Sequence, residues 1–257
     1  MNLAEFAHIF DCSVPEILRR LRNDKNDFWR FWWTQFASEP MGAHHASLDR
    51  SMCHFGKMMK DVDVAPFLEE VEAKPENWLL DTKRNKIGVQ QHTNSILLRG
   101  AVYTSVPGAN NVNIMMDVQE SAAREVSAHY PRLMHFLNQF AEHYGKGTLS
   151  RAMIVRLTPK QEVGRHWDSG YYYLCRDRYH LILQSAGSLM ECAGIRCTWN
   201  VGELWWFNNN LWHSAGNDGD DWRIHVIFDV LPARNAALPE EFKRHTAYYR
   251  SKELEPT

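Results

Sequence analysis

Three features that would assign the sequence to a class at once are missing from it. Its five cysteines include no Cys-x-x-Cys pair, and their spacing matches no zinc-binding pattern. No run of eighteen apolar residues occurs, so the sequence predicts no transmembrane helix and no membrane association. Its 29 basic residues nearly balance its 31 acidic residues, so charge indicates neither general nucleic-acid binding nor attachment to an anionic surface. The composition is that of an ordinary globular protein.

The cysteines and the first residues of the chain bear on its compartment. The number of cysteines is odd, and residues 1–20 do not resemble a secretory leader. Both observations predict free thiols and a cytoplasmic location. The 257 residues, of which 44% are hydrophobic, suit one large domain with a core of useful size. The sequence does not indicate an oligomeric state.

Residues 1–77 are predicted to form an N-terminal helical region. Ser13, Pro15 and Glu16 have the order of a capping box at a helix start. Aromatic residues between positions 28 and 36 then recur at helical spacing, which is typical of a packing face. A substrate lid or a docking surface is the alternative. Residues 64–75 predict a second, shorter helix.

Residues 78–235 predict a β domain that contains one helix, over about residues 117–145. Runs with strand character occupy residues 90–101, 151–158, 178–185, 194–199, 202–207 and 222–230. Short strands at this spacing favour a sandwich or barrel over β-α-β units. Residues 236–257 are predicted to be a peripheral tail.

The stretch "GRHWDSGYY" contains His166 and Asp168, two residues apart. In an extended strand such residues project to the same side, where they could be metal ligands or simply a polar strand end. His213 follows 45 residues after Asp168, which is enough chain to return across a barrel. Two histidines and one carboxylate form the facial triad of non-haem Fe(II) oxygenases. The set therefore predicts a metal site.

Two predicted strands each place an arginine and a histidine on one face. Arg178 alternates with His180, and Arg223 alternates with His225. An arginine inside a small barrel is costly unless it meets an anion. The pattern predicts a dianionic small molecule or two buried carboxylates inside. A keto acid such as 2-oxoglutarate fits, because one end could bind the metal while Arg223 holds the distal carboxylate.

From about residue 90 to residue 230, the sequence resembles the aspartyl/asparaginyl β-hydroxylase family of Fe(II)/2-oxoglutarate oxygenases, which includes bacterial proline cis-hydroxylases. The likeness rests on "HWDSG", "RDRYHLILQS", "GELWWFNNNLWHSAGN" and "WRIHVIFDV". It implies a mainly β fold with α-helices: a double-stranded β-helix, the jelly-roll or cupin-like core, with N-terminal and packing helices.

The resemblance also implies roles for the site residues. His166, Asp168 and His213 would bind iron, and Arg178 and His180 would contact the metal-side carboxylate of 2-oxoglutarate. Animal β-hydroxylases have glycine at the position of Asp168. Its presence here is similar to the small bacterial amino-acid hydroxylases and argues against a halogenase, which needs that coordination position for chloride.

Several further residues are candidates for the substrate pocket. They are Trp167, Tyr171, Arg176, Trp205, Trp212 and His225, with the rest of the "YYY" run beside Tyr171. For the aromatic residues the alternative is core packing. For Arg176 the alternative is an exposed loop cation, and His225 is predicted to share the inward face with Arg223.

The sequence thus predicts an enzyme that uses Fe(II), 2-oxoglutarate and O2 to hydroxylate an unactivated C–H of a free amino acid or a similar small metabolite. One alternative substrate is an Asp, Asn or Pro-type side chain in a protein or peptide. An alternative of another class is a jelly-roll module that binds a metal or ligand without turnover.

Overall fold

The structure, a computed structural model, describes residues 15, 54–102, 118–168 and 170–240. The predicted capping box and aromatic stripe lie outside the described residues, except Pro15, which is helical. The segment 241–257 of the predicted tail and the side chain of Tyr171 also lie outside them. Within the described part of the chain, no helix has the length and apolar character needed to cross a membrane.

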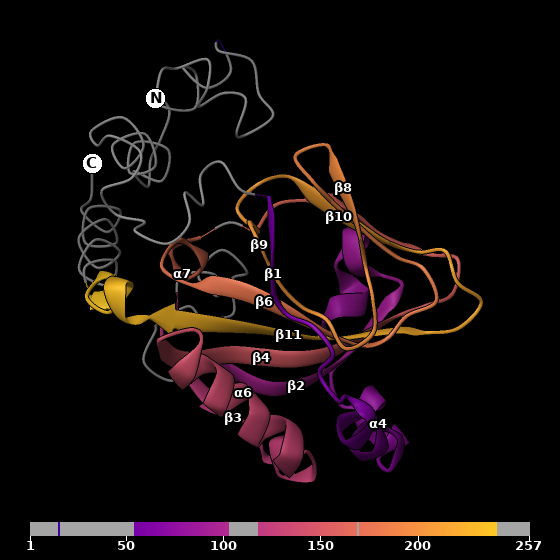
Figure 1. The fold of residues 1–257 in the computed structure, drawn as a ribbon, viewed down its shortest axis with the longest axis horizontal. Helices are drawn as coiled ribbons and strands as arrows, with labels where there is room; N and C mark the ends of the chain where they lie inside the picture. The colour runs from indigo at the N-terminus through magenta and orange to yellow at the C-terminus, as the bar shows by residue number, and fades with distance from the viewer. Residues whose placement is uncertain (1–14, 16–53, 103–117, 169, 241–257) are drawn as a thin grey trace, which may run out of the picture.

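Two antiparallel sheets form the core of the molecule (Figure 1). The larger sheet contains, in spatial order, β1 (Phe55–Met59), β9 (Leu204–Phe207), β6 (Asp177–Gln184), β11 (Arg223–Pro232), β4 (Gly147–Leu157), β2 (Thr93–Ala101) and β3 (Ser121–Ala123). The smaller sheet contains β5 (Glu162–His166), β10 (His213–Asn217), β7 (Ser188–Cys192) and β8 (Ile195–Trp199).

The order of the strands identifies the fold. From β4 to β11 the chain passes from one sheet to the other after each strand, except at the β7–β8 hairpin. Alternation of this kind between two antiparallel sheets is a jelly roll. The prediction of a double-stranded β-helix is therefore confirmed.

Helices cover the outer face of the larger sheet. They are α4 (Ala65–Glu72) and α6 (Pro131–His143), which lie on one side of β2, β4 and β11 in Figure 1. Phe140 of α6 packs against Tyr179 of β6 and Phe228 of β11, with ring centroids 5.0 and 5.4 Å away. This contact places the main apolar core between the helices and the sheet.

The predicted alternation of faces along β6 and β11 is confirmed. Tyr179 and Phe228 belong to the core under the helices, whereas Ile182 belongs to a second apolar cluster between the two sheets. Because successive side chains of a strand point to opposite faces, Arg178, His180, Arg223 and His225 all face the space between the sheets. That interior is where the candidate site lies.

The helix predicted over about residues 117–145 is shorter than expected. It begins at Pro131, and the residues before it form β3 and a 3-10 turn, η5 (Glu125–His129). Proline at the first helical position disfavours the α conformation at the residue before it, and Tyr130 has φ −126° and ψ 52°. The upstream segment instead pairs with β2, with Arg99 opposite Ala123.

The predicted boundary at residue 77 is also corrected. The strand β1 lies within the predicted helical region, yet it pairs with β9, with Phe55 opposite Phe207. Residues 55–59 therefore belong to the larger sheet. The short helix predicted over residues 64–75 is confirmed as α4.

Short helical turns fill the connections. They are η1 (Pro75–Leu79), η2 (Arg84–Lys86), η3 (Gly88–Gln90), α7 (Tyr171–Leu174) and η6 (Ala233–Asn235). The segment 84–90 lies between β2 of the larger sheet and β5 of the smaller one. A Cβ added to Gly164 of β5 would lie 3.3 Å from Val89, so this segment closes the gap between the two sheets.

We predict that Phe140→Ala lowers the free energy of unfolding by ~3–5 kcal/mol, because it removes a buried ring between helix and sheet. Chemical denaturation measures the change. The control is Glu142→Ala on the exposed side of the same helix, for which a change within ~0.5 kcal/mol is expected. Equal effects of the two substitutions would contradict this placement of the core.

Candidate metal centre and anion site

His166 and His213 face each other across two paired strands. His166 ends β5, His213 begins β10, and the register places the two residues directly opposite each other. Side chains at such positions lie on the same face of the sheet. The two ring centroids are 4.4 Å apart, so strand pairing alone brings these imidazoles together.

Backbone carbonyls orient both imidazoles. Nδ1 of His166 donates to the Gly164 carbonyl at 2.7 Å, and Nδ1 of His213 donates to the Leu211 carbonyl at 2.8 Å. A carbonyl oxygen only accepts, so each proton lies on Nδ1. Nε2 of each neutral ring then keeps its lone pair, which is the arrangement found in metal-binding histidines.

Asp168 completes the cluster from the loop after β5. Its backbone N–H donates to the Asn209 carbonyl at 3.0 Å, which ties this loop to the one before β10. The potential ligand atoms of His166, Asp168 and His213 lie within 4.8 Å of one another. The three residues predicted to bind a metal are therefore gathered in one place.

Arg178 lies between two carboxylates. Its Nε and Nη2 donate to the two oxygens of Asp229 at 2.7 and 2.9 Å, and its Nη1 donates to Oδ2 of Asp168 at 2.6 Å. Asn209 donates to the same Oδ2 at 3.0 Å. Within the described residues, Oδ1 of Asp168 has no hydrogen bond, so it is the oxygen left for a metal.

The charges of this bridge set the pKa values of its members. Burial would raise the pKa of Asp168, but Arg178 and the two histidines lower it to about 2. Burial would lower the pKa of Arg178, and Asp229 and Asp168 raise it well above its ordinary value. Burial lowers the pKa of His213 to about 4 against the pull of Asp168. At neutral pH the cluster therefore offers one carboxylate and neutral imidazole.

Arg223 is the second arginine of the interior, and its surroundings differ. It is only 6% exposed, and its Nε donates to the Ser188 hydroxyl at 2.7 Å while Nη2 contacts the Met190 sulfur at 3.0 Å. No carboxylate of the described residues forms an ion pair with it. Burial lowers its pKa to about 9. An uncompensated buried guanidinium is a binding site for an anion.

A chain of hydrogen bonds connects Arg223 to His180. Ser188 accepts from Arg223, and its Oγ lies 3.2 Å from Nε2 of His225. Nδ1 of His225 lies 3.4 Å from Nδ1 of His180. The tautomers of the two rings set the direction of these two hydrogen bonds. Burial and Arg223 lower the pKa of both histidines well below the ordinary value.

One buried polar group beside this chain, Ser95 Oγ, has no hydrogen-bond partner among the described residues. Ser95 faces the interior, because it pairs with Val155, which pairs with His225. Buried polar groups are normally satisfied, so Ser95, together with Arg223, fits a polar, anionic ligand inside the barrel.

The predicted pocket aromatics divide between the two faces of the sheets. Trp205 faces the interior and stacks on Trp199 at 5.6 Å. Trp167 and Trp212 lie together, 6.2 Å apart, and Arg165 lies 5.2 Å above the Trp212 ring. Arg165 precedes His166 in β5 and points to the opposite face, so Trp167 and Trp212 lie outside the barrel. Their role as walls of a substrate pocket stays a prediction.

The other members of the tyrosine run lie beside the arginine bridge. Tyr172 is buried and donates to Asp229 at 3.1 Å. The Tyr173 ring lies 4.7 Å from the Arg178 guanidinium. Both tyrosines therefore pack around the bridge and support it from the side of α7.

Arg176 corresponds to neither of its predicted roles. It is 7% exposed, so it is not an exposed loop cation. Its Nη1 and Nη2 donate to the Gln119 side chain and backbone at 2.6 and 2.8 Å, and its Nε donates to Ser150 at 3.0 Å. These bonds anchor the segment before β3 rather than the pocket. His225, in contrast, lies inside the barrel as predicted.

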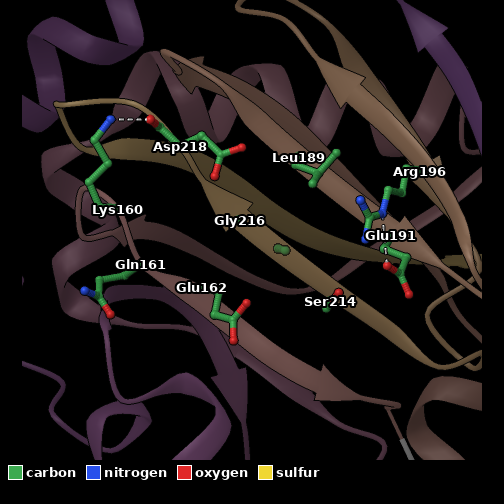
Figure 2. A pocket seen from close by; sticks show the side chains of 10 residues that line it. Lys160, Gln161, Glu162, Leu189, Glu191, Arg196, Ser214, Gly216 and Asp218 are labelled. Atoms are coloured by element: carbon green, nitrogen blue, oxygen red, sulfur yellow. Dashed lines mark hydrogen bonds and ion pairs between the residues drawn. The ribbon is translucent and has the colours of Figure 1, made fainter.

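A pocket on the outer face of the smaller sheet is separate from this centre (Figure 2). It is lined by Lys160, Gln161, Glu162, Leu189, Glu191, Arg196, Ser214, Ala215, Gly216 and Asp218. Ser214 and Gly216 alternate along β10 with His213 and Ala215, which face the interior. The pocket therefore cannot contribute to the metal centre.

Sequence reasoning did not single out Ser188, Asn209 or Arg84. The pairing of Asp229 with Arg178 was also not predicted. That pairing follows from register, since Asp229 lies opposite Arg178 across β11 and β6. For Ser188 and Asn209 the sequence carries no comparable signal, because their partners are distant in the chain.

Comparison with known proteins gives a family match over part of the chain. Residues 112–232 match the family model described as aspartyl/asparaginyl beta-hydroxylase. The matched range contains the two histidines, Asp168 and both interior arginines, and it confirms the resemblance stated from the sequence. No curated protein matches the sequence.

This chain is also similar to solved structures of low sequence identity. An oxidoreductase of the 2OG-Fe(II) oxygenase family from Burkholderia pseudomallei is 10% identical, with a TM-score of 0.48 over 77% of this chain and 94% of that one. A predicted oxalate decarboxylase from Thermotoga maritima is 16% identical, with a TM-score of 0.28 over 36% and 73%. A cupin 2 conserved barrel domain protein from Salinispora arenicola is 13% identical, with a TM-score of 0.28 over 37% and 70%.

We predict that Arg178→Met lowers the free energy of unfolding by ~3–5 kcal/mol, because it leaves the buried Asp168 and Asp229 carboxylates without their shared cation. Chemical denaturation at neutral pH measures the loss. Arg196→Met is the matched control, since the Arg196 side chain is 70% exposed and its ion pair with Glu191 contributes ~0–1 kcal/mol. If Arg178→Met lowers the free energy of unfolding no more than the control does, the contacts of Arg178 with Asp168 and Asp229 do not stabilise the site.

Proposed function

We propose, from the match of residues 112–232 to the aspartyl/asparaginyl beta-hydroxylase family model, that the protein is an Fe(II)/2-oxoglutarate-dependent dioxygenase. Its substrate is a free amino acid or a similar small metabolite, which it hydroxylates at an unactivated C–H. The observation that carries the proposal is the pairing, inside one barrel, of a His-Asp-His cluster with a buried arginine that has no carboxylate partner among the described residues.

The donor set suits iron. Nε2 of His166, Nε2 of His213 and Oδ1 of Asp168 would hold the metal, which leaves its other positions for small molecules. Arg223 would hold the distal carboxylate of 2-oxoglutarate, and His180 would contact the metal-side end. When bound, iron with 2-oxoglutarate and O2 supplies oxidative decarboxylation of the keto acid and transfer of one oxygen atom to the substrate.

The residues of the chain contribute orientation and exclusion of water. Arg178 and Asn209 hold one oxygen of Asp168, so that the other is presented in a fixed direction. The Phe207 ring contacts both His180 and His213, with centroids 5.1 and 5.0 Å away, and shields them from solvent. The carbonyls of Gly164 and Leu211 place the Nδ1 protons of His166 and His213, so these two rings need not change tautomer when a metal binds.

Two other functions have weaker support. An Asp, Asn or Pro-type side chain of a protein or peptide is the alternative substrate, and the family match is compatible with it. A metal-binding module without turnover would not require a buried, uncompensated Arg223, because burying a lone cation destabilises a fold. The arginine therefore favours an enzyme that uses an anionic co-substrate.

The first test is turnover of 2-oxoglutarate. The purified protein with Fe(II), 2-oxoglutarate and O2 is expected to form succinate slowly even without a primary substrate. His213→Ala should abolish this activity, because it removes a ligand of the metal. Ser214→Ala, on the opposite face of the same strand, should retain it. Succinate is measured by chromatography, and its absence from the wild-type protein under every loading condition would overturn the proposal.

The second test concerns the distal carboxylate. Arg223→Ala is expected to weaken 2-oxoglutarate binding by ~2–4 kcal/mol, a factor of ~30 to ~700 in Kd, because a buried charge partner is lost. Titration calorimetry on the zinc-loaded protein, which cannot turn over, measures the Kd. The exposed Arg196→Ala variant should bind as the wild type does. An unchanged Kd for Arg223→Ala would show that the carboxylate binds elsewhere.

A further inference from the structure

Arg84 is a third arginine that reaches the interior of the barrel. It belongs to η2, in the segment that closes the gap between β2 and β5. Its Nε donates to the Thr93 hydroxyl at 3.3 Å, and its Nη1 contacts the Met153 sulfur at 3.6 Å. These two contacts fix the direction of the side chain, because they hold one edge of the guanidinium against β2 and β4.

The two contact residues face the space between the sheets. Thr93 pairs with Leu157, which pairs with Arg223 on β11. Met153 pairs with Ile227, which pairs with His180 on β6. Residues opposite each other in neighbouring strands share a face. The Arg84 side chain therefore lies over the same interior face that carries the arginine bridge and the co-substrate residues.

Arg84 has no counter-ion among the described residues. It forms no ion pair there, its bonds go to a hydroxyl and a thioether, and its Nη2 has no hydrogen bond. Asp81, the nearest acidic neighbour in sequence, accepts instead from the backbone N–H of Lys83 at 3.0 Å. One edge of the guanidinium is thus left with N–H donors that are not used by the chain.

The charges of the arginine bridge act on Arg84. Burial, then the positive charge of Arg178, lower the pKa of Arg84 to about 10, against opposing effects of Asp168, Tyr173 and Asp81. Arg84 is half-buried, unlike Arg223, so its side chain is partly open to solvent.

We propose that Arg84 binds a carboxylate of the primary substrate and holds the substrate beside the metal centre. A guanidinium edge with two free N–H groups matches the two oxygens of a carboxylate. Arg223 takes the distal carboxylate of 2-oxoglutarate at the other, fully buried position, so the two anions do not compete. The inference rests on the proposed dioxygenase function and adds the group by which the substrate is recognised.

The carboxylate can come from two sources, which share this chemistry. One is the α-carboxylate of a free amino acid, and the other is an acidic side chain or the C-terminus of a peptide. The probes are therefore the twenty L-amino acids, the corresponding L-amino-acid amides, and N-acetyl-aspartyl and N-acetyl-glutamyl amides. Stimulation by amino acids but not by their amides assigns the first source. Stimulation by the N-acetylated acidic amides assigns the second.

The experiment compares Arg84→Ala and Arg84→Lys with Lys86→Ala, an exposed cation of the same turn. With the probe that most stimulates the wild type, Arg84→Ala should raise KM by ~10- to 100-fold, the loss typical of one charge-assisted contact. Arg84→Lys should recover part of the affinity, and Lys86→Ala should match the wild type. Calorimetric binding of the same probe to the zinc- and 2-oxoglutarate-loaded protein gives a readout that does not depend on turnover.

Succinate formation without any probe separates this inference from the proposed function. Lys86→Ala should retain wild-type succinate formation without substrate, and Arg84→Ala should retain wild-type affinity for 2-oxoglutarate. If the wild type forms no succinate, the proposed function fails. If it does, and Arg84→Ala leaves probe binding and KM unchanged, the inference about Arg84 fails. A loss of 2-oxoglutarate affinity in Arg84→Ala would also overturn it, since Arg84 would then serve the co-substrate.

Discussion

The site depends on one ionic contact, the bridge from Asp229 through Arg178 to Asp168. It connects β11 and β6 of the larger sheet to the loop after β5 of the smaller one, so the two sheets meet at a fixed geometry. A guanidinium is planar and rigid, and it presents its N–H groups in fixed directions. The bidentate contact with Asp229 fixes the plane of the Arg178 guanidinium. The remaining Nη1 then fixes the position of the Asp168 carboxylate relative to His166 and His213.

The two arginines predicted on the inward face serve different purposes. Arg178 is compensated by two buried carboxylates, whereas Arg223 is compensated by none of the described residues. The sequence predicted either a dianionic molecule or two buried carboxylates. Two carboxylates are found at Arg178, and an anion at Arg223 stays a proposal. A buried charge without a partner lowers stability, so an anion bound at Arg223 would stabilise the fold.

Period-2 patterns explain how much of the site could be predicted. Arg178 with His180 and Arg223 with His225 each share a face because they alternate along single strands, and that depends on local sequence alone. Asp168 lies in the loop after β5, and its backbone contact with Asn209 places it near His166. The contacts of Ser188 and Asn209 depend on register between strands that are distant in the chain, and Arg176 binds Gln119 across such a distance. The role of Trp167 and Trp212 in a substrate pocket stays a prediction, because aromatic character does not indicate which face of a strand a ring occupies.

In the proposed enzyme, the residues that would determine the chemistry and those that would select the substrate lie in different parts of the chain. All the residues assigned to the metal and to 2-oxoglutarate lie within residues 112–232, the range of the family match. Arg84 and the segment 84–90 lie before that range, and they reach the interior only because they fill the gap between β2 and β5. A change in this segment can alter the mouth of the barrel without moving β5, β6, β10 or β11. Substrate preference can therefore vary among chains that share the same metal and co-substrate residues.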